Sequence, residues 1–329
     1  MKKKDVSFET ALRALGSNTP PTPRQLRGLT NLDNDQLAEL QIAWPELNAN
    51  RRAMVADKLR ELAENDIELD FSAIFHFTLS DVEESVRLAS VEGLWEDETP
   101  GLIDPLVILL RSDTSPIVRA ACATSLGRFM ELAELEKLSR RRHDQIYSAL
   151  MGAILTNPPG SLVYNRALTA LAYVSNEQVD QLIREGYDST DQGLRVAAVM
   201  AMGRSGDTAY GELVLQQVNS VLPPMRVEAA RACGELGVKE AVADLGKLLD
   251  DPEPDVVDAA IVALGQIGGD AAKEILQRAA ESEDEEIAAA AEEALEELEF
   301  LRGDIKFATP WFDELGTADD GDGNHKHDQ

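Results

Sequence analysis

The residues that could carry catalysis or hold a metal are few in this chain of 329 residues, and they do not cluster. The four histidines are His76, His143, His325 and His327. None of them has the His-Glu-x-x-His spacing that holds zinc on a helix. The tail imitates the start of a calcium-binding loop, but its sixth position is His325, where that loop requires glycine. Neither a phosphate-binding glycine loop nor a serine nucleophile elbow occurs. We therefore expect no catalytic residue, no metal site and no cofactor.

The two cysteines are the remaining reactive side chains. Cys122 and Cys233 lie far apart in the sequence, each within an alanine-rich helical pattern. Such residues are expected to be reduced and buried in the core rather than joined in a disulfide. The N-terminus lacks the apolar segment of a secretory signal, and no apolar run is long enough to cross a bilayer. The sequence thus predicts a cytoplasmic protein that has no membrane partner.

The net charge of −29 narrows the range of partners. It is concentrated towards the C-terminus, where the stretch 227–329 contains 28 acidic and only 8 basic residues. A surface this negative repels the phosphates of nucleic acids and of anionic lipids. We expect neither as a partner, whereas a basic protein surface would be attracted. Solubility alone would also account for the charge.

A repeated pattern organises most of the chain. Five segments align: SPIVRAACATSLG (115–127), GSLVYNRALTALA (160–172), DQGLRVAAVMAMG (191–203), LPPMRVEAARACG (222–234) and EPDVVDAAIVALG (253–265). The position that is most often arginine, here termed the arginine column, comprises Arg87, Arg119, Tyr164, Arg195, Arg226, Val257 and Ala288. Successive members are 32, 45, 31, 31, 31 and 31 residues apart. Four equal steps in succession predict a tandem repeat.

Each repeat contains two helical patterns separated by a turn. The second helix begins after Asp or Pro, residues that suit a helix start, and Asp113, Asp191 and Asp251 are placed to cap it. The glycine column near its end comprises Gly127, Gly203, Gly234 and Gly265. This column permits either a left-handed cap or close approach of two helices. Apolar and small residues one before, three after and seven after the arginine column form one helical stripe. A single helix pair cannot bury that stripe alone, so the pattern predicts stacked pairs.

The motif Asp-Pro followed by Val-Arg, Ala-Ala and Leu-Gly resembles the short HEAT repeats of the phycobilisome-lyase type, over residues 72–300. The resemblance implies an all-α fold: a HEAT-type α-solenoid in which antiparallel helix pairs stack into a right-handed superhelix, with the second helices on the concave face. Tyr164, Val257 and Ala288 depart from the arginine column. Deoxyhypusine hydroxylases are similar in fold and hold iron with His-Glu pairs. No histidine here precedes a glutamate, so that activity is not expected.

Five segments are expected along the chain. They are a flexible arm over 1–23, an irregular helical cap over 24–71, an array of about seven helix pairs over 72–302 with an insertion near 128–144, an aromatic segment over 303–315, and a disordered acidic tail over 316–329. We interpret the arginines of the column as a ladder that ties the turn of one repeat to the next. Their regular spacing favours this structural role over a catalytic one.

The resulting hypothesis is a non-enzymatic, monomeric scaffold that binds a protein partner on its concave face. The candidate contact residues are Val196, Met200, Val227, Arg231, Asp258 and Val262. A solvated helix face should be polar throughout, so the apolar members indicate a groove. The other interpretation is that the curvature of the superhelix buries them within the stack.

Two segments outside the regular pattern are further candidates. Arg140, Arg141 and Arg142 form the one dense basic cluster, which is either a contact for an acidic partner or a solvated helix start. Trp311 and Phe312 either fold back on the last helix or dock a partner. An assembly factor or chaperone could use either segment. The resemblance also leaves open a relative of the phycobilin lyases, which attach or remove chromophores.

Overall fold

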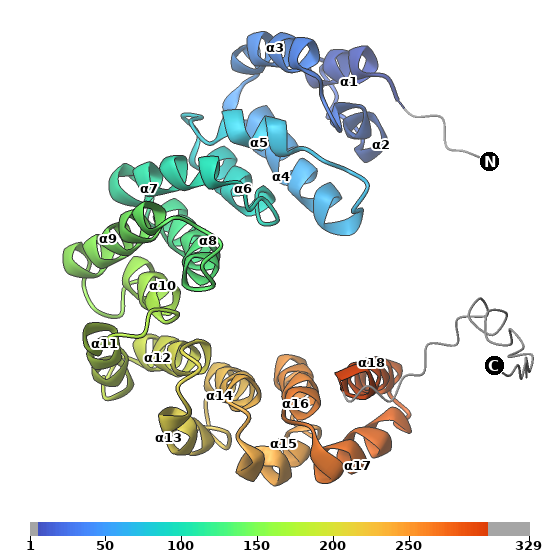
Figure 1. Ribbon diagram of the computed structural model, residues 1–329. Coiled ribbons are helices and arrows are strands. Elements are labelled where there is room, and N and C mark those ends of the chain that lie inside the picture. The colour runs from blue at the N-terminus through green and yellow to red at the C-terminus, as the bar shows by residue number, and fades with distance from the viewer. Residues whose placement is uncertain (1–5, 302–329) are drawn as a thin grey trace, which may run out of the picture.

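The computed structural model describes residues 6–301, and the regular structure in that span is helical throughout (Figure 1). The α-helices are α1 (Phe8–Leu15), α2 (Pro23–Leu26), α3 (Asn34–Ala43), α4 (Ala49–Asn65), α5 (Ser72–Thr78), α6 (Glu84–Gly93), α7 (Ile103–Ser112), α8 (Pro116–Glu134), α9 (Arg140–Thr156), α10 (Leu162–Leu171), α11 (Glu177–Tyr187), α12 (Gln192–Arg204), α13 (Gly211–Leu215), α14 (Pro223–Glu235), α15 (Val242–Leu248), α16 (Pro254–Ile267), α17 (Gly269–Ala280) and α18 (Glu285–Leu301). Short 3-10 turns lie at Arg27–Leu29, Trp44–Glu46, Pro100–Leu102, Thr208–Tyr210 and Lys239–Ala241.

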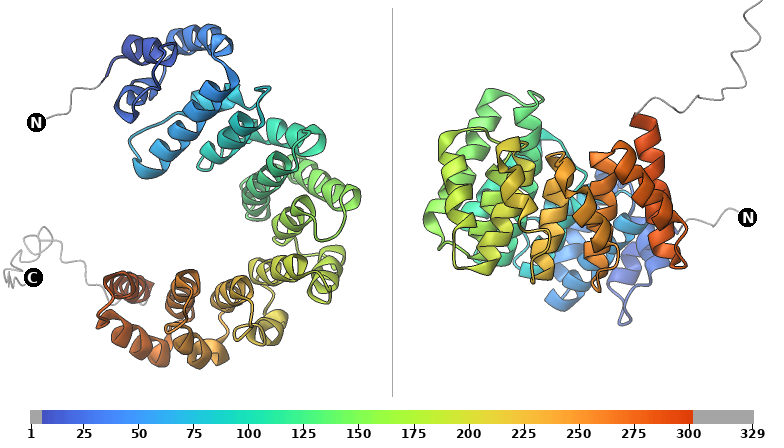
Figure 2. Two further views of the ribbon diagram at one scale, coloured as in Figure 1. Left: turned by 180° about the vertical axis from the view of Figure 1, so that it is seen from behind. Right: turned by 90° about the horizontal axis from the view of Figure 1, so that it is seen from below.

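The helices form two rows along an open arc (Figures 1 and 2). The inner row contains α4, α6, α8, α10, α12, α14, α16 and α18, and consecutive members of this row pack on each other. The outer row contains the first helix of each pair. The N-terminal helices and α18 face each other across the mouth of the arc (Figure 1). From α5 to α18 the described residues contain seven helix pairs, and the second helices form the concave face, as predicted.

The stripe predicted on the second helices is the core of the stack. The small residues three positions after the arginine column are fully buried, from Ser90 on α6 to Ala291 on α18. Apolar residues one position before the column, such as Val118 and Val256, are buried as well. Small side chains let neighbouring inner helices approach closely, and the apolar side chains beside them fill the remaining space. The fold is therefore an all-α solenoid of stacked antiparallel helix pairs.

Glycine allows consecutive inner helices to touch. At Gly234 on α14, a Cβ atom would lie 2.9 Å from the Cα atom of Ala263 on α16, so a larger residue would force these helices apart. The backbone at Gly234 is helical, so close approach and not a left-handed cap explains the glycine column. The left-handed positions form a second column three residues later, where Gly237 has a φ of 63° just after α14. Gly206 and Gly268 also have a positive φ, of 65° and 63°, at the same 31-residue step.

Arginine–aspartate pairs lock consecutive repeats together. Arg226 on α14 donates two hydrogen bonds of 2.7 Å to the carboxylate of Asp251, which lies in the turn of the next repeat. Asp251 also accepts the N–H of Glu253 at 3.1 Å. Arg87 on α6 bonds Asp113 in the same bidentate way, at 2.6 and 2.8 Å. The predicted ladder is confirmed at these two arginines.

A third pair lies outside the predicted ladder, whereas two predicted members, Arg119 and Arg195, make no ion pair within residues 6–301. Arg52 on α4 pairs with Asp81, in the turn between α5 and α6, at 2.9 Å. The arginine column therefore begins one inner helix earlier than the sequence pattern indicated. Arg119 instead donates from Nε to the carbonyl of Leu110 within its own repeat. The ladder prediction is wrong there, because the next turn (157–161) contains no aspartate.

Two of the three predicted aspartate caps have this inter-repeat role instead. Asp191 caps α12 by accepting the N–H of Leu194 at 2.7 Å, as predicted. Asp113 accepts the N–H of Ser115, and it is Ser115 that caps α8. Asp251 likewise lies two residues before the N-cap position of α16. Asp113 and Asp251 bond the arginine of the preceding repeat, and each lies two residues before the N-cap of its helix.

The N-terminal region packs onto the stack from residue 8 onward. α1 lies within the segment predicted as a flexible arm over 1–23, but its Phe8 and Leu15 are buried. The arm is therefore the wrong description of α1, because the apolar face of this helix covers the turn Arg27–Leu29. Within the predicted cap over 24–71, α4 packs on α6, whereas α3 contacts α1 and α5. The inner row thus begins one helix earlier than expected.

The 45-residue step contains longer helices and no additional element. α8 has 19 residues and α9 has 17, whereas α10 has 10. The predicted insertion near 128–144 is therefore the end of α8, a turn and the start of α9. Ser139 caps α9 by accepting the N–H of Arg142. Arg140 to Arg142 accordingly form the first turn of α9, which is a helix start rather than a loop.

Candidate functional site

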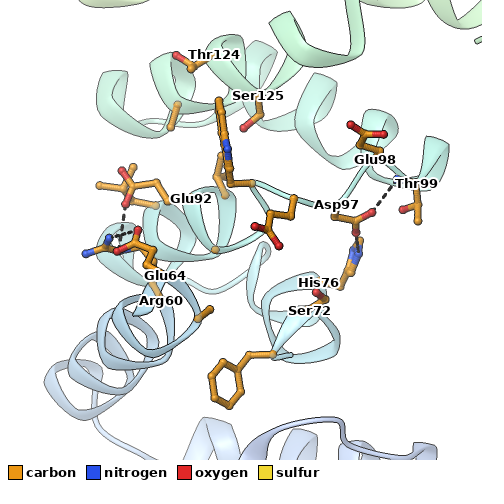
Figure 3. Close-up of a pocket in the computed structure, with 18 of the residues that line it drawn as sticks. Arg60, Glu64, Ser72, His76, Glu92, Asp97, Glu98, Thr99, Thr124 and Ser125 are labelled. Carbon is orange, nitrogen blue, oxygen red and sulfur yellow. Dashed lines mark hydrogen bonds and ion pairs between the residues drawn. The ribbon is translucent and has the colours of Figure 1, made fainter. Parts of the chain in front are cut away.

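A hollow of about 1570 Å³ opens on the N-terminal half of the inner row. It is lined by side chains of α4, α5, α6, α8 and α10 and by the connection from α6 to α7 (Figure 3). We call it the Trp95 hollow, because Trp95 in that connection is its largest side chain. Four consecutive inner helices therefore contribute to one concave surface.

Trp95 is presented to this hollow by a fixed contact behind it. Its side chain is half-exposed (53%). Its backbone N–H donates to the carbonyl of Glu92 at 3.1 Å. The guanidinium carbon of Arg128, on α8, lies 4.5 Å from the ring centroid. Arg128 is not among the residues that line the hollow, so it covers one face of the indole from behind. The other part of the ring is open to a ligand.

The connection that carries Trp95 is fixed on its far side by a buried carboxylate. Asp97 lies 2.6 Å from Nε2 of His76, on α5, and accepts the N–H of Thr99 at 2.7 Å (Figure 3). Burial raises the pKa of Asp97, but the hydrogen bonds from Thr99 and His76 outweigh it and hold the pKa below its usual value. Asp97 is therefore charged at neutral pH and holds the loop against α5.

The opposite wall contains one arginine shared among carboxylates. Arg60 on α4 pairs with Glu64 at 2.6 Å and with Glu92 at 3.4 Å (Figure 3), and also with Asp57 on its own helix at 3.0 Å. Partial burial, together with the nearby Glu64 and Asp57, raises the pKa of Glu92, although Arg60 opposes the shift. The positive charge of Arg60 is thus already used within the wall, and it does not make the hollow attractive to anions.

The lining as a whole is negative with apolar patches. Its carboxylates are Glu64, Asp70, Glu92, Glu96, Asp97 and Glu98, and its arginines are Arg60 and Arg166. The six carboxylates and two arginines together carry a formal net charge of −4. The exposed apolar side chains are Trp95, Ile67, Ile117 and Leu162. The hollow therefore offers carboxylates and apolar contacts side by side.

The contact residues predicted from the sequence lie farther along the inner row. Val196 and Met200 are on α12, Val227 and Arg231 on α14, and Asp258 and Val262 on α16. None of these six lines the Trp95 hollow. Val227 is only 9% exposed, because α14 packs between α12 and α16, and for this residue burial within the stack is the correct interpretation.

The other five predicted contact residues remain candidates, and they differ in how exposed their side chains are. Val196 and Met200 are half-buried, whereas Val262 is 52% exposed. Arg231 is exposed and pairs with Glu228 at 3.2 Å on the same helix. Asp258 is exposed. The apolar groove predicted across three repeats is therefore interrupted at its centre.

The predicted basic cluster lies on the outer row. Arg140 and Arg141 are exposed, and Arg140 pairs with Asp144 one turn along α9. Arg142 pairs with Asp104 on α7 at 2.7 Å. The cluster thus contributes at least one contact between neighbouring outer helices. Trp311 and Phe312 lie outside the described residues.

Trp95 was missed by sequence reasoning, although the sequence contains a signal for it. It stands eight positions after Arg87, which is the place of the glycine column. Gly127, Gly203 and Gly234 occupy that place in other repeats. A large aromatic residue fits here because α6 ends at Gly93 and the chain leaves the stack. A departure from a small-residue column, followed by the acidic run Glu-Asp-Glu, could have identified the hollow.

The described residues contain no other obvious chemical site. Cys122 and Cys233 are unpaired and buried, and burial raises the pKa of the Cys122 thiol and raises that of Cys233 to about 12. Between residues 6 and 301, no three His, Cys, Asp or Glu side chains are grouped to hold a metal. The helices of this span include none that is long and apolar enough to cross a membrane.

Comparison with known proteins agrees with the fold. A family model described as HEAT repeats matches residues 72–155 and 211–296. None of the curated proteins compared with the chain matches it. The complex of CpcE and CpcF of phycocyanin lyase from Nostoc sp. PCC7120 is 18% identical, with 80% of this chain and 95% of that chain covered and a TM-score of 0.54. Human deoxyhypusine hydroxylase is 18% identical, covering 89% and 96% with a TM-score of 0.38. Yeast importin-beta (Kap95p) is 14% identical, covering 88% and 46% with a TM-score of 0.46.

Proposed function

The chain belongs to the HEAT-repeat family, whose model matches more than half of it, and from this premise we propose that it is a non-enzymatic scaffold that binds another protein on its concave face. A solenoid of this kind provides an extended concave surface on a rigid stack, which suits protein recognition in general. The Trp95 hollow is the part of that surface to which we assign the main contact.

The half-exposed side chain of Trp95 carries this proposal. Tryptophan is enriched among the residues that dominate binding energies, because it buries a large apolar area with little loss of conformational freedom. Here the ring is already held by Arg128, so little further ordering is needed on binding. A partner that covers Trp95 would also cover exposed Ile117 and Leu162 on the next two inner helices.

The predicted residues of the C-terminal half fit an extension of the same contact. Met200 and Val262 lie on the inner row, as do the charged Arg231 and Asp258. We propose that they form a secondary contact, which a long partner would reach along the arc. Val227 is excluded from this contact by its burial.

Chromophore attachment is the alternative that the likeness to phycocyanin lyase suggests. That likeness, at 18% identity, concerns the fold alone. A bilin carries carboxylates of its own, and the lining of the Trp95 hollow, with its net charge of −4, would repel them. Charge therefore favours a protein partner over a bilin. Absorbance spectra of the protein mixed with a bilin test this alternative directly, and a spectral shift would support it.

The compartment and oligomeric state remain part of the proposal. Two buried, unpaired cysteines in a chain of this length suit a reducing compartment, which supports the cytoplasm. We also propose a monomer, because the repeat stack buries its own core and leaves the concave face for a partner.

The experiment is quantitative affinity capture from the native cell with three versions of the chain. W95A removes the central contact, whereas I108A removes an apolar side chain of similar exposure on α7, in the outer row. We expect one or a few partners that wild type and I108A capture equally and that W95A loses. Equal capture by all three, with helical content unchanged, would refute the assignment of the contact to this hollow.

A further inference from the structure

The charge of the Trp95 hollow is not fully neutralised within the protein. Arg60 pairs with Glu64 and Glu92, and Asp97 is bonded by His76. Glu96 and Glu98, by contrast, are exposed, and within residues 6–301 neither makes an ion pair. Both flank Asp97 in the connection that carries Trp95. Two free carboxylates therefore stand next to the main apolar side chain of the site, where they favour a cationic ligand.

The indole of Trp95 does not itself favour a cation. An aromatic face attracts a cation through its quadrupole, but the guanidinium of Arg128 already occupies one face. A second cation on the opposite face would be close enough to be repelled by Arg128. Burial lowers the pKa of Arg128, but Glu98 and Asp97 oppose this, and an arginine remains charged at neutral pH. The open part of the ring is thus suited to an apolar side chain.

These two features specify different parts of one ligand. We propose that the Trp95 hollow binds a segment of the partner in which a large apolar side chain lies beside lysine or arginine. The apolar side chain packs on Trp95 and towards Ile117 and Leu162, and the basic side chains pair with Glu96 and Glu98. This inference rests on the proposed function and adds the chemistry of the segment that is recognised. Charge complementarity between this ligand and the negative lining is the reason for choosing it.

The test selects peptides without assuming the partner. A phage-displayed library of random twelve-residue peptides is selected on the full chain and counter-selected on W95A. We expect enriched peptides to combine Lys or Arg with Leu, Phe or Trp. Their affinity, measured by fluorescence anisotropy, should fall about tenfold in E96Q/E98Q and should lose much of its salt dependence. The matched control D35N/E39Q, two exposed carboxylates on α3 outside the hollow and outside the secondary contact, should bind like wild type.

The inference is overturned if no peptide is enriched over the counter-selection, if the enriched peptides are acidic or uncharged, or if E96Q/E98Q binds them as tightly as wild type. Failure of the proposed function is a separate result. If W95A still captures every cellular partner, the hollow is not the contact site at all. If W95A loses the partner but E96Q/E98Q retains it, the scaffold function stands and the basic segment does not. Both glutamates are exposed, so their replacement leaves the fold intact.

Discussion

Arg226 and Asp251 can be replaced by the two residues that occupy the same positions one repeat later. There the arginine column holds Val257, which is buried, and the aspartate position holds Ser282, whose Oγ accepts the N–H of Asp284 at 3.2 Å. The double substitution R226V/D251S therefore reproduces the combination of Val257 and Ser282 found in the next repeat. Each single substitution leaves one partner of the interlock unsatisfied, and the double substitution removes both.

The magnitude follows from the burial of the pair. The side chains of Arg226 and Asp251 are 12% and 8% exposed, and breaking a buried pair typically costs about 3–5 kcal/mol. Here the guanidinium keeps its bond to the carbonyl of Ser220, and the carboxylate keeps the N–H of Glu253, so we expect about 2 kcal/mol for each single change. For the double change we expect about 1 kcal/mol instead of the additive sum, a coupling of about 3 kcal/mol.

The assay is urea unfolding followed by far-UV circular dichroism, with hydrogen exchange of the α14–α16 segment as a local readout. The local readout is needed because repeat arrays can unfold in steps. The exposed pair Arg140–Asp144 provides the control, since R140V and D144S should each leave the urea midpoint nearly unchanged. A double variant as unstable as the sum of its singles would refute the interlock.

Three further predictions concern packing, reactivity and pH. G234A should destabilise the protein by about 1–3 kcal/mol, because its Cβ would meet the backbone of α16. G152A, whose Cβ would meet no atom within 4 Å, should instead stabilise α9 by about 0.5–1 kcal/mol. Urea midpoints distinguish the two variants, and equal effects would contradict the packing argument. Burial and raised thiol pKa values should keep Cys122 and Cys233 unreactive towards a thiol reagent at pH 8 until urea unfolds the chain, so fast labelling of native protein would count against the stack. The hydrogen bond from Arg226 lowers the pKa of Asp251 in the folded state. The pair should therefore stabilise the fold fully above about pH 4 and lose this effect as the pH falls through the lowered pKa. D251S should make stability depend less steeply on pH in acid, and an unchanged dependence would contradict the prediction.

Much of the solenoid was predictable because the stack repeats one set of contacts. Ala198, Ala229 and Ala260 recur at a fixed step since each must be small for the same reason, and periodicity exposes such a constraint. For the same reason, the periodicity predicted that an arginine such as Arg87 would bond the turn of the next repeat, where Asp113 lies. Arg52 was missed because its helix keeps the interlock but has Val55 at the small position and Arg60 at the glycine position.

The site was less predictable because binding surfaces arise where the pattern fails. Val227 was chosen from its helical offset, but that offset does not specify how far the curvature of the stack closes over it. Trp95 lies in a connection, and its exposure depends on where α6 ends and on the contact with Arg128 from the next repeat. Those are tertiary facts that one sequence does not contain, although a tryptophan in a glycine column is a readable anomaly.

The most direct test of the account is site-specific photo-crosslinking in the native cell. A photoreactive amino acid is placed at position 95, in the hollow, or at position 108, on the outer row, and the adducts are identified by mass spectrometry. The account predicts a discrete protein adduct from position 95 that is absent from position 108 and that maps to a basic segment with a large apolar residue. No adduct from position 95, or the same adducts from both positions, would contradict the claim that the concave hollow is where this scaffold binds its partner.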